Sequence, residues 1–242
     1  MNYVLDGYQR DVAASAPVSA RVAFIKRTYL HLAGAIVAFV GIEALLFSSG
    51  MAEQIIKDLF LSHRMAWFGL MLLFMVGGMG AQYMARSHQS VGMQYAGLAL
   101  YVLLEVVIFL PLLYVATNPR FGGSTALPLQ AGIVTLAVFG GLTVAVFMSG
   151  KDFSFMGPFL WCGFFLICGL SIAMSLFGFN FGLLICGAML AVVAGFIIYN
   201  TSNVIHQYGT NEHVAASLQL FASVALLFWY ILQIFWSLNS DD

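Results

Sequence analysis

Residues 199–236, YNTSNVIHQYGTNEHVAASLQLFASVALLFWYILQIFW, decide the fold, because their second half is an apolar stretch with polar side chains along its whole length. The recurring polar residues are Gln219, Ser223, Tyr230 and Gln233. Their spacings of four, seven and three positions place them on one face of a helix with ~3.6 residues per turn. In lipid, such side chains prefer protein or water to hydrocarbon. We therefore expect a central last helix over residues 214–236, with Asn200 on the preceding helix as a direct or water-bridged neighbour.

The composition of the chain defines its class. Hydrophobic residues make up 62%, charged residues 8%, and the mean hydropathy is +0.95, whereas roughly 25% of a soluble domain is charged. The chain is therefore expected to be an integral membrane protein in contact with lipid. Its net charge of -1 offers no basic surface for nucleic acid. Cys162, Cys168 and Cys186 lie in apolar runs without metal-ligand spacing, which is typical of small buried hydrophobic residues.

Seven apolar runs are long enough to cross a ~30 Å hydrocarbon core, which takes ~20 residues of helix. They cover residues 28–48, 66–85, 92–116, 127–149, 157–177, 181–201 and 214–236. An all-α fold follows, with a polar N-terminal tail (1–26), a seven-helix transmembrane domain (27–236) and a short acidic C-terminal tail (237–242). Only residues 178–180 separate the fifth and sixth runs, so these two helices are expected to form an antiparallel hairpin.

A shorter segment, residues 52–65, has an amphipathic pattern. Its apolar residues, which face one way on a helix, are Ile55, Ile56, Leu59 and Phe60. Its charged residues, which face the other way, are Glu53, Lys57 and Asp58. Because the segment is too short and too charged to span a bilayer, we expect a helix lying on the membrane surface.

The lysines and arginines predict the orientation of the seven spans. On the side of the amino terminus lie Arg10, Arg21, Lys26, Arg27, Arg86 and Lys151. On the other side lie Lys57, Arg64 and Arg120. This excess favours a cytoplasmic amino terminus and places the carboxyl terminus on the opposite side of the membrane.

Two acidic residues fall inside the spans, where burial of a charge usually implies a partner or a function. Glu43 is near the outer end of the first span, and a position among the lipid headgroups is one reading of it. Glu105 is midway along the third span, six residues before Pro111, where a kink is expected. The sequence is compatible with two roles for Glu105: a functional group, or one member of a buried pair that stabilises the structure. Arg86, at the end of the second span, is typical of an anchor at the membrane edge.

No catalytic motif stands out in the chain. The histidines are isolated in sequence, and neither HExxH nor GxSxG occurs. No glycine-rich phosphate loop is present. We therefore expect neither an enzyme nor a bound cofactor.

Two stretches together carry a family resemblance. Residues 149–155, SGKDFSF, precede the fifth span, and residues 201–206, TSNVIH, precede the striped last helix. With seven spans and the Lys26-Arg27-Thr28-Tyr29 entry to the first, the chain resembles the Bax inhibitor-1 (TMBIM) family from about residue 24 onward. The match is closest to its bacterial YccA branch. The resemblance implies a bundle whose last helix is wrapped by the other six.

The resemblance also implies a particular latch in the bundle. Family members that leak calcium in a pH-dependent way carry two aspartates and one arginine, which fall here on Asn200, Ser223 and Arg86. Two neighbouring carboxylates can share a proton, whereas an amide and a hydroxyl do not titrate near neutral pH. We therefore expect no proton-sensing latch at these positions.

Two functions remain open at this point. Proteins of the YccA branch are similar in binding the membrane-anchored protease FtsH as slow substrates, for which residues 1–26 would provide a handle in the bacterial inner membrane. The alternative is a calcium or proton leak, with Glu105 and Arg86 as charged candidates and Asn200 and Ser223 as pore or latch positions.

Overall fold

The computed structural model describes residues 12–61, 65–87, 90–177 and 182–240. Within these residues the α-helices are α1 (Val18–Ser48), α2 (Met51–Ile55), α3 (Ala66–Ala85), α4 (Val91–Thr117), α5 (Leu127–Ser149), α6 (Gly157–Phe177), α7 (Gly182–His206) and α8 (His213–Ser240). Short helical turns are η1 (Ile56–Leu61), η2 (Pro119–Phe121) and η3 (Ser154–Met156). All α-helices except α2 are long and apolar enough to cross a membrane. The prediction of seven spans in an all-α membrane protein is confirmed.

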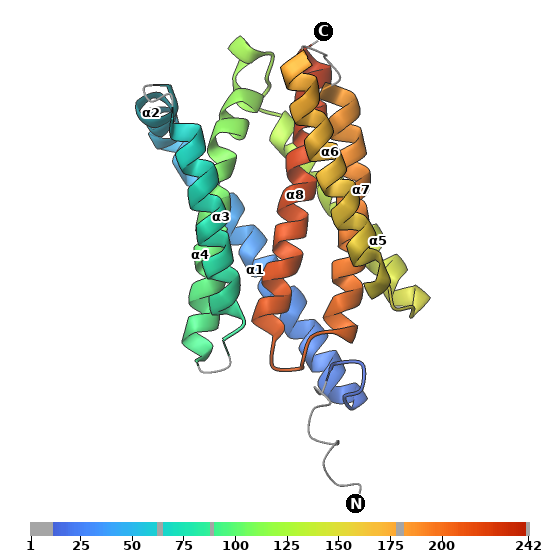
Figure 1. Ribbon diagram of the computed structural model, residues 1–242. Helices are drawn as coiled ribbons and strands as arrows, with labels where there is room; N and C mark the ends of the chain where they lie inside the picture. The colour runs from blue at the N-terminus through green and yellow to red at the C-terminus, as the bar shows by residue number, and fades with distance from the viewer. Residues whose placement is uncertain (1–11, 62–64, 88–89, 178–181, 241–242) are drawn as a thin grey trace, which may run out of the picture.

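Helix α8 is the central helix of the bundle. No side chain from His213 to Ser237 is fully exposed, whereas every other long helix presents large apolar side chains outward. Helices α1, α3, α4, α5 and α7 pack against α8, and Figure 1 shows α8 between the α3/α4 pair and the α6/α7 pair. The central position expected from the polar stripe is therefore confirmed. Helix α6 differs from the expected wrapping, because it packs mainly on α7.

The chain enters the bundle earlier than expected. Helix α1 begins at Val18, and Val12 forms an antiparallel bridge with Gly209 in the α7–α8 loop. The backbone N–H groups of Ala13 and Ala14 donate to the carbonyl oxygens of Tyr208 and Ile205, both at 2.9 Å. The last carbonyls of a helix have no partner within it, so this segment satisfies one at the end of α7. Residues 12–26, which the sequence placed in a polar tail, are thus held by backbone hydrogen bonds and by α1, and residues 1–11 lie outside the described residues.

The carboxyl end of α8 also extends beyond the predicted boundary. The helix continues to Ser240, so residues 237–240 of the expected tail are helical. Trp236 donates from Nε1 to the carbonyl oxygen of Phe121, and Asn239 donates from Nδ2 to that of Gly122, both at 2.8 Å. These bonds fasten the end of α8 to the α4–α5 connection, which explains why the helix is longer than its apolar run.

Residues 51–61 form the expected short helix, as α2 followed by the π-helical turn η1. Ala52 and Ile56 are buried, and the exposed side carries an ion pair between Lys57 Nζ and Glu53 Oε1 at 2.7 Å. The amphipathic pattern is therefore present in the described part of this segment. Its predicted end at residue 65 falls beyond a gap at residues 62–64, which lie outside the described residues.

A glycine sets the close approach of α3 and α4. A Cβ on Gly97 would lie 2.5 Å from the carbonyl oxygen of Ala81 and 2.6 Å from the backbone nitrogen of Ala85. Small residues at such crossings let membrane helices pack backbone to backbone. Helix α4 then continues without interruption through Pro111, where the sequence led us to expect a kink.

Candidate functional site

The polar face of α8 is hydrogen-bonded to α7 inside the bundle. Asn200 donates from Nδ2 to Ser223 Oγ at 2.8 Å, and both side chains are 5% exposed. Ser223 Oγ donates in turn to the carbonyl oxygen of Gln219 at 3.0 Å. The Ser223 hydroxyl therefore donates its proton to a carbonyl within α8 and accepts a hydrogen bond from α7. Of the two arrangements that the sequence left open, the structure has the direct contact rather than the water bridge.

The C-terminal part of the stripe also faces protein. Gln233 accepts a hydrogen bond through Oε1 from Cys186 Sγ of α7 at 3.3 Å. Tyr230 is half-buried and lies near Cys168 of α6 as well as Cys186. The expectation that all three cysteines are buried is wrong for Cys162, which is exposed on α6.

Three further hydroxyls converge in the interior. Tyr29 of α1 faces Thr143 of α5 and Thr201 of α7. Their oxygens are buried. Polar groups from α1, α5 and α7 therefore meet inside the bundle, in addition to the Asn200–Ser223 pair between α7 and α8.

Both intramembrane acids are buried in protein. Glu105 of α4 is 5% exposed, with Tyr101 one turn earlier on the same helix as its neighbour. Glu43 of α1 is 6% exposed, and among the described residues neither of its carboxyl oxygens has a hydrogen-bond partner. The packing of the bundle therefore encloses Glu43, whereas its depth relative to the headgroups stays a prediction.

Arg86 lies at the end of the bundle that also holds the N-terminal segment. The side chain is exposed and interacts with Tyr208 in the α7–α8 loop. Burial raises the pKa of Tyr208, and the positive charge of Arg86 acts against this rise. Ser223, by contrast, is ten residues into α8, about 15 Å along its axis. The structure therefore joins Arg86 to the loop and not to the Asn200–Ser223 pair.

The two stretches that carried the family resemblance meet in space. Asp152 Oδ1 accepts hydrogen bonds from the Ser154 backbone N–H at 2.8 Å, from Ser154 Oγ at 2.6 Å and from Ser202 Oγ at 3.3 Å. Ser154 Oγ also lies 3.1 Å from Asn203 Oδ1, an alternative acceptor for its single proton. The bonds from Ser154 hold the pKa of Asp152 below its usual range. This cluster ties the α5–α6 connection to the end of α7.

The cluster contains a serine, a histidine and an aspartate, but their geometry does not form a proton relay. His206 Nδ1 is 3.3 Å from Ser202 Oγ and 3.8 Å from Asp152 Oδ1. A relay uses one ring nitrogen for the nucleophile and the other for the carboxylate. Here both contacts involve Nδ1, so the arrangement supports positioning of the loop.

A histidine pair at the same end was missed by sequence reasoning. The rings of His31 on α1 and His213 on α8 have centroids 5.0 Å apart. His31 Nδ1 is 2.7 Å from the carbonyl oxygen of Arg27, and Nε2 is 2.8 Å from Tyr95 Oη. Because a carbonyl only accepts, Nδ1 carries the proton, and in the neutral ring Nε2 accepts from Tyr95. The two histidines are isolated in sequence, so no local spacing could have revealed this contact.

Across the described ranges, no group of three or more histidine, cysteine or acidic side chains could hold a metal ion. The site is instead a set of buried hydrogen-bonding groups around α8, together with two enclosed carboxyls. The fold and the site define a multi-pass helical membrane protein built around a polar central helix.

A family model described as inhibitor of apoptosis-promoting Bax1 matches residues 21–241, so the chain belongs to the Bax inhibitor-1 family. It is 28% identical to protein lifeguard 4 of Mus musculus over 228 residues, covering 93% of this chain and 90% of that protein. It is 37% identical to an uncharacterized protein of Pseudomonas aeruginosa over 120 residues, covering 47% of this chain and 51% of that protein. It is 34% identical to a BI1-like protein of Arabidopsis thaliana over 138 residues, covering 53% of this chain and 54% of that protein. The alignments thus span about half the length of the latter two relatives.

Proposed function

We propose that this bundle provides a leak for a small cation, a calcium ion or a proton, across the membrane. The observation that carries the proposal is the enclosure of two carboxyls, Glu43 and Glu105, at 6% and 5% exposure within membrane-spanning helices. Burial of an acid in the membrane costs several kcal/mol, and such residues mark ion or proton pathways more often than structural sites. The free oxygens of Glu43 are available as ligands for a cation.

The hydrogen-bonded pair Asn200–Ser223 holds the pathway closed in our proposal. The Asn200–Ser223 bond joins α7 to the central helix, so a pathway along α8 requires the two helices to part. Asn and Ser do not titrate near neutral pH, so this closure does not respond to protons as a pair of aspartates would. The hydroxyls of Tyr29, Thr143 and Thr201 extend the polar region toward the N-terminal end of the bundle.

Ion flux into liposomes that contain the purified protein tests the leak. We expect Glu105→Gln and Glu43→Gln each to reduce the flux severalfold, because the amide keeps the volume of the side chain and removes its charge. Glu53→Gln is the matched control, since Glu53 is an exposed acid paired with Lys57 on the surface helix. An unchanged flux in the Glu43→Gln, Glu105→Gln double variant would contradict the proposed pathway.

A second candidate function rests on the amino terminus. Residues 1–11 are mostly polar, with Asp6, Arg10 and Asp11, and they precede the point at which Val12 and Ala13 attach to the α7–α8 loop. In this proposal the protein lies in a bacterial inner membrane with its amino terminus in the cytoplasm. Residues 1–11 are then the handle by which the membrane-anchored protease FtsH engages it as a slow substrate, which modulates the protease.

Two deletions separate the effect of residues 1–11 from that of the anchor, the segment from Val12 to Ala14 that is bonded to the end of α7 and the α7–α8 loop. Removal of residues 2–11 should slow degradation by the protease severalfold in a pulse-chase, because the attached segment from Val12 onward is retained. Removal of residues 2–20 also deletes the anchor and the first helical residues, so it serves as the comparison for a loosened bundle. An unchanged half-life after the shorter deletion, at matched expression, would exclude this handle.

A further inference from the structure

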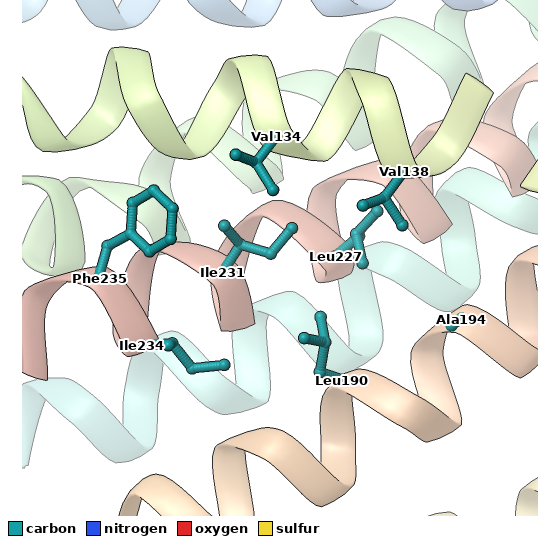
Figure 2. Close-up of a pocket in the computed structure, with 8 residues that line it drawn as sticks. All are labelled: Val134, Val138, Leu190, Ala194, Leu227, Ile231, Ile234 and Phe235. Carbon is teal, nitrogen blue, oxygen red and sulfur yellow. The ribbon is translucent and has the colours of Figure 1, made fainter. Parts of the chain in front are cut away.

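An apolar crevice lies between α5, α7 and α8, within the membrane-spanning part of the bundle. Figure 2 shows its walls and its floor: Val134 and Val138 come from α5, Leu190 and Ala194 from α7, and Leu227 and Ile231 from α8. Its volume is about 150 Å³. Every residue that lines it is apolar.

Water does not suit this crevice. A buried water needs two to four polar partners, and an apolar cavity of ~150 Å³ stays dry and takes an apolar guest. The floor residues Leu227 and Ile231 are 0% and 3% exposed, so the recess reaches the core of the bundle. The crevice is therefore suited to an apolar ligand.

The outer wall of the crevice borders the lipid. Val134 and Val138 are 37% and 36% exposed, and their neighbour on α5, Ile133, is 61% exposed. Val134 is seven residues from the start of α5, about 10 Å along the helix, which is inside the hydrocarbon region of a spanning helix. The apolar groups next to the mouth of the crevice are therefore lipid tails.

We propose that this crevice binds one acyl chain of a bilayer phospholipid. A helix from a second copy of the protein is ~10 Å wide and cannot enter a recess of this size, whereas a single hydrocarbon chain is thin enough to do so. The lining residues on α8 extend from Leu227 to Phe235, about 12 Å along the axis, so the recess runs lengthwise along the helix as an acyl chain does.

The occupant would lie beside the hydrogen bond between α7 and α8. Leu227 is one turn beyond Ser223 on α8, and Ala194 is six residues before Asn200 on α7. An acyl chain between the walls would therefore touch both helices joined by that bond. This proposal concerns binding alone and does not depend on ion conduction by the protein.

The test uses the full chain, reconstituted in vesicles of a phospholipid mixture that contains a phospholipid with a photoreactive diazirine on its acyl chain. After illumination, the labelled peptides are mapped by mass spectrometry. We expect strong labelling of the peptides that hold Leu190, Ala194 and Leu227. Ala194→Leu should reduce it severalfold by filling the crevice from α7, and Val138→Phe should do so from α5.

The control is Leu184→Phe, which enlarges a lipid-facing side chain of α7 that is 65% exposed and does not line the crevice. It should leave labelling of the crevice unchanged. Melting temperature and gel filtration identify variants that have lost their fold. If only one of Ala194→Leu and Val138→Phe folds, that variant alone is compared with the wild type. Two results would each overturn the proposal: labelling of the crevice no stronger than at Leu184, or labelling that neither Ala194→Leu nor Val138→Phe reduces.

Discussion

The Asn200–Ser223 bond allows a quantitative prediction for a double-mutant cycle. Ser223→Ala leaves the Asn200 amide buried without its acceptor, which costs about 1–3 kcal/mol. Asn200→Ala leaves Ser223 still donating to the carbonyl oxygen of Gln219, so its cost comes mainly from the lost contact and the space left behind. We expect a coupling energy of about 0.6 kcal/mol and at most about 1.7 kcal/mol, the average and the maximum from double-mutant cycles on interhelical hydrogen bonds in a membrane protein.

The free energy of unfolding can be measured for the wild type, both single variants and the double variant, by steric trapping in lipid bicelles. A coupling of about 1.4 kcal/mol corresponds to a tenfold change in the unfolding equilibrium. As a control, the cycle is repeated with Asn200→Ala and Ser237→Ala, which lie in different parts of the bundle and should be additive. A coupling energy of zero at Asn200 and Ser223 would refute the direct bond and, with it, the closed pathway that we propose.

Other variants test separate features of the molecule. In flux assays between about pH 6 and 8, Asn200→Asp with Ser223→Asp should make the flux more steeply acid-dependent than that of the wild type, because two neighbouring carboxylates can share a proton; a pH dependence unchanged from the wild type would contradict this. Gly97→Ala should lower stability by about 1–3 kcal/mol or abolish folding, because its Cβ would collide with a backbone carbonyl of α3; Gly80→Ala, with open space around it, is the matched control in thermal unfolding. Asp152→Asn should remove a contribution to stability that is fully present above the ordinary pKa of an aspartate and is lost as the pH falls from there through the lowered pKa of Asp152, which unfolding at stepwise acid pH would detect.

The spans were predictable because hydrophobic length alone determines which segments can cross a bilayer. The predicted ends of the first and last spans were wrong, because both helices continue beyond their apolar runs. Val18 lies before the positive charges at Arg21, Lys26 and Arg27, which a hydropathy scan reads as a boundary, yet the helix continues through them. Ser240 belongs to α8 because its last turn is bonded to the α4–α5 connection.

The candidate site was predictable only where one helix carried its own pattern. Ser223 belongs to a stripe with helical spacing, and Asn200 was expected close to it across a short loop. The pair of His31 and His213 joins positions that are 182 residues apart and have no pattern in common, so only the packing of α1 against α8 brings them together. The enclosure of Glu43 likewise depends on neighbours that its own helix does not specify.

The attachment of the N-terminal segment to the α7–α8 loop has a mechanical consequence. A force applied to the amino terminus acts first on the bridge between Val12 and Gly209 and then on the bonds of Ala13 and Ala14, one after another. Bonds loaded in sequence separate at lower force than bonds loaded together, so this segment would peel away before the bundle bears the load. The next element under tension is then α1, whose N-terminal turns would unwind while α8 still holds the other helices in place.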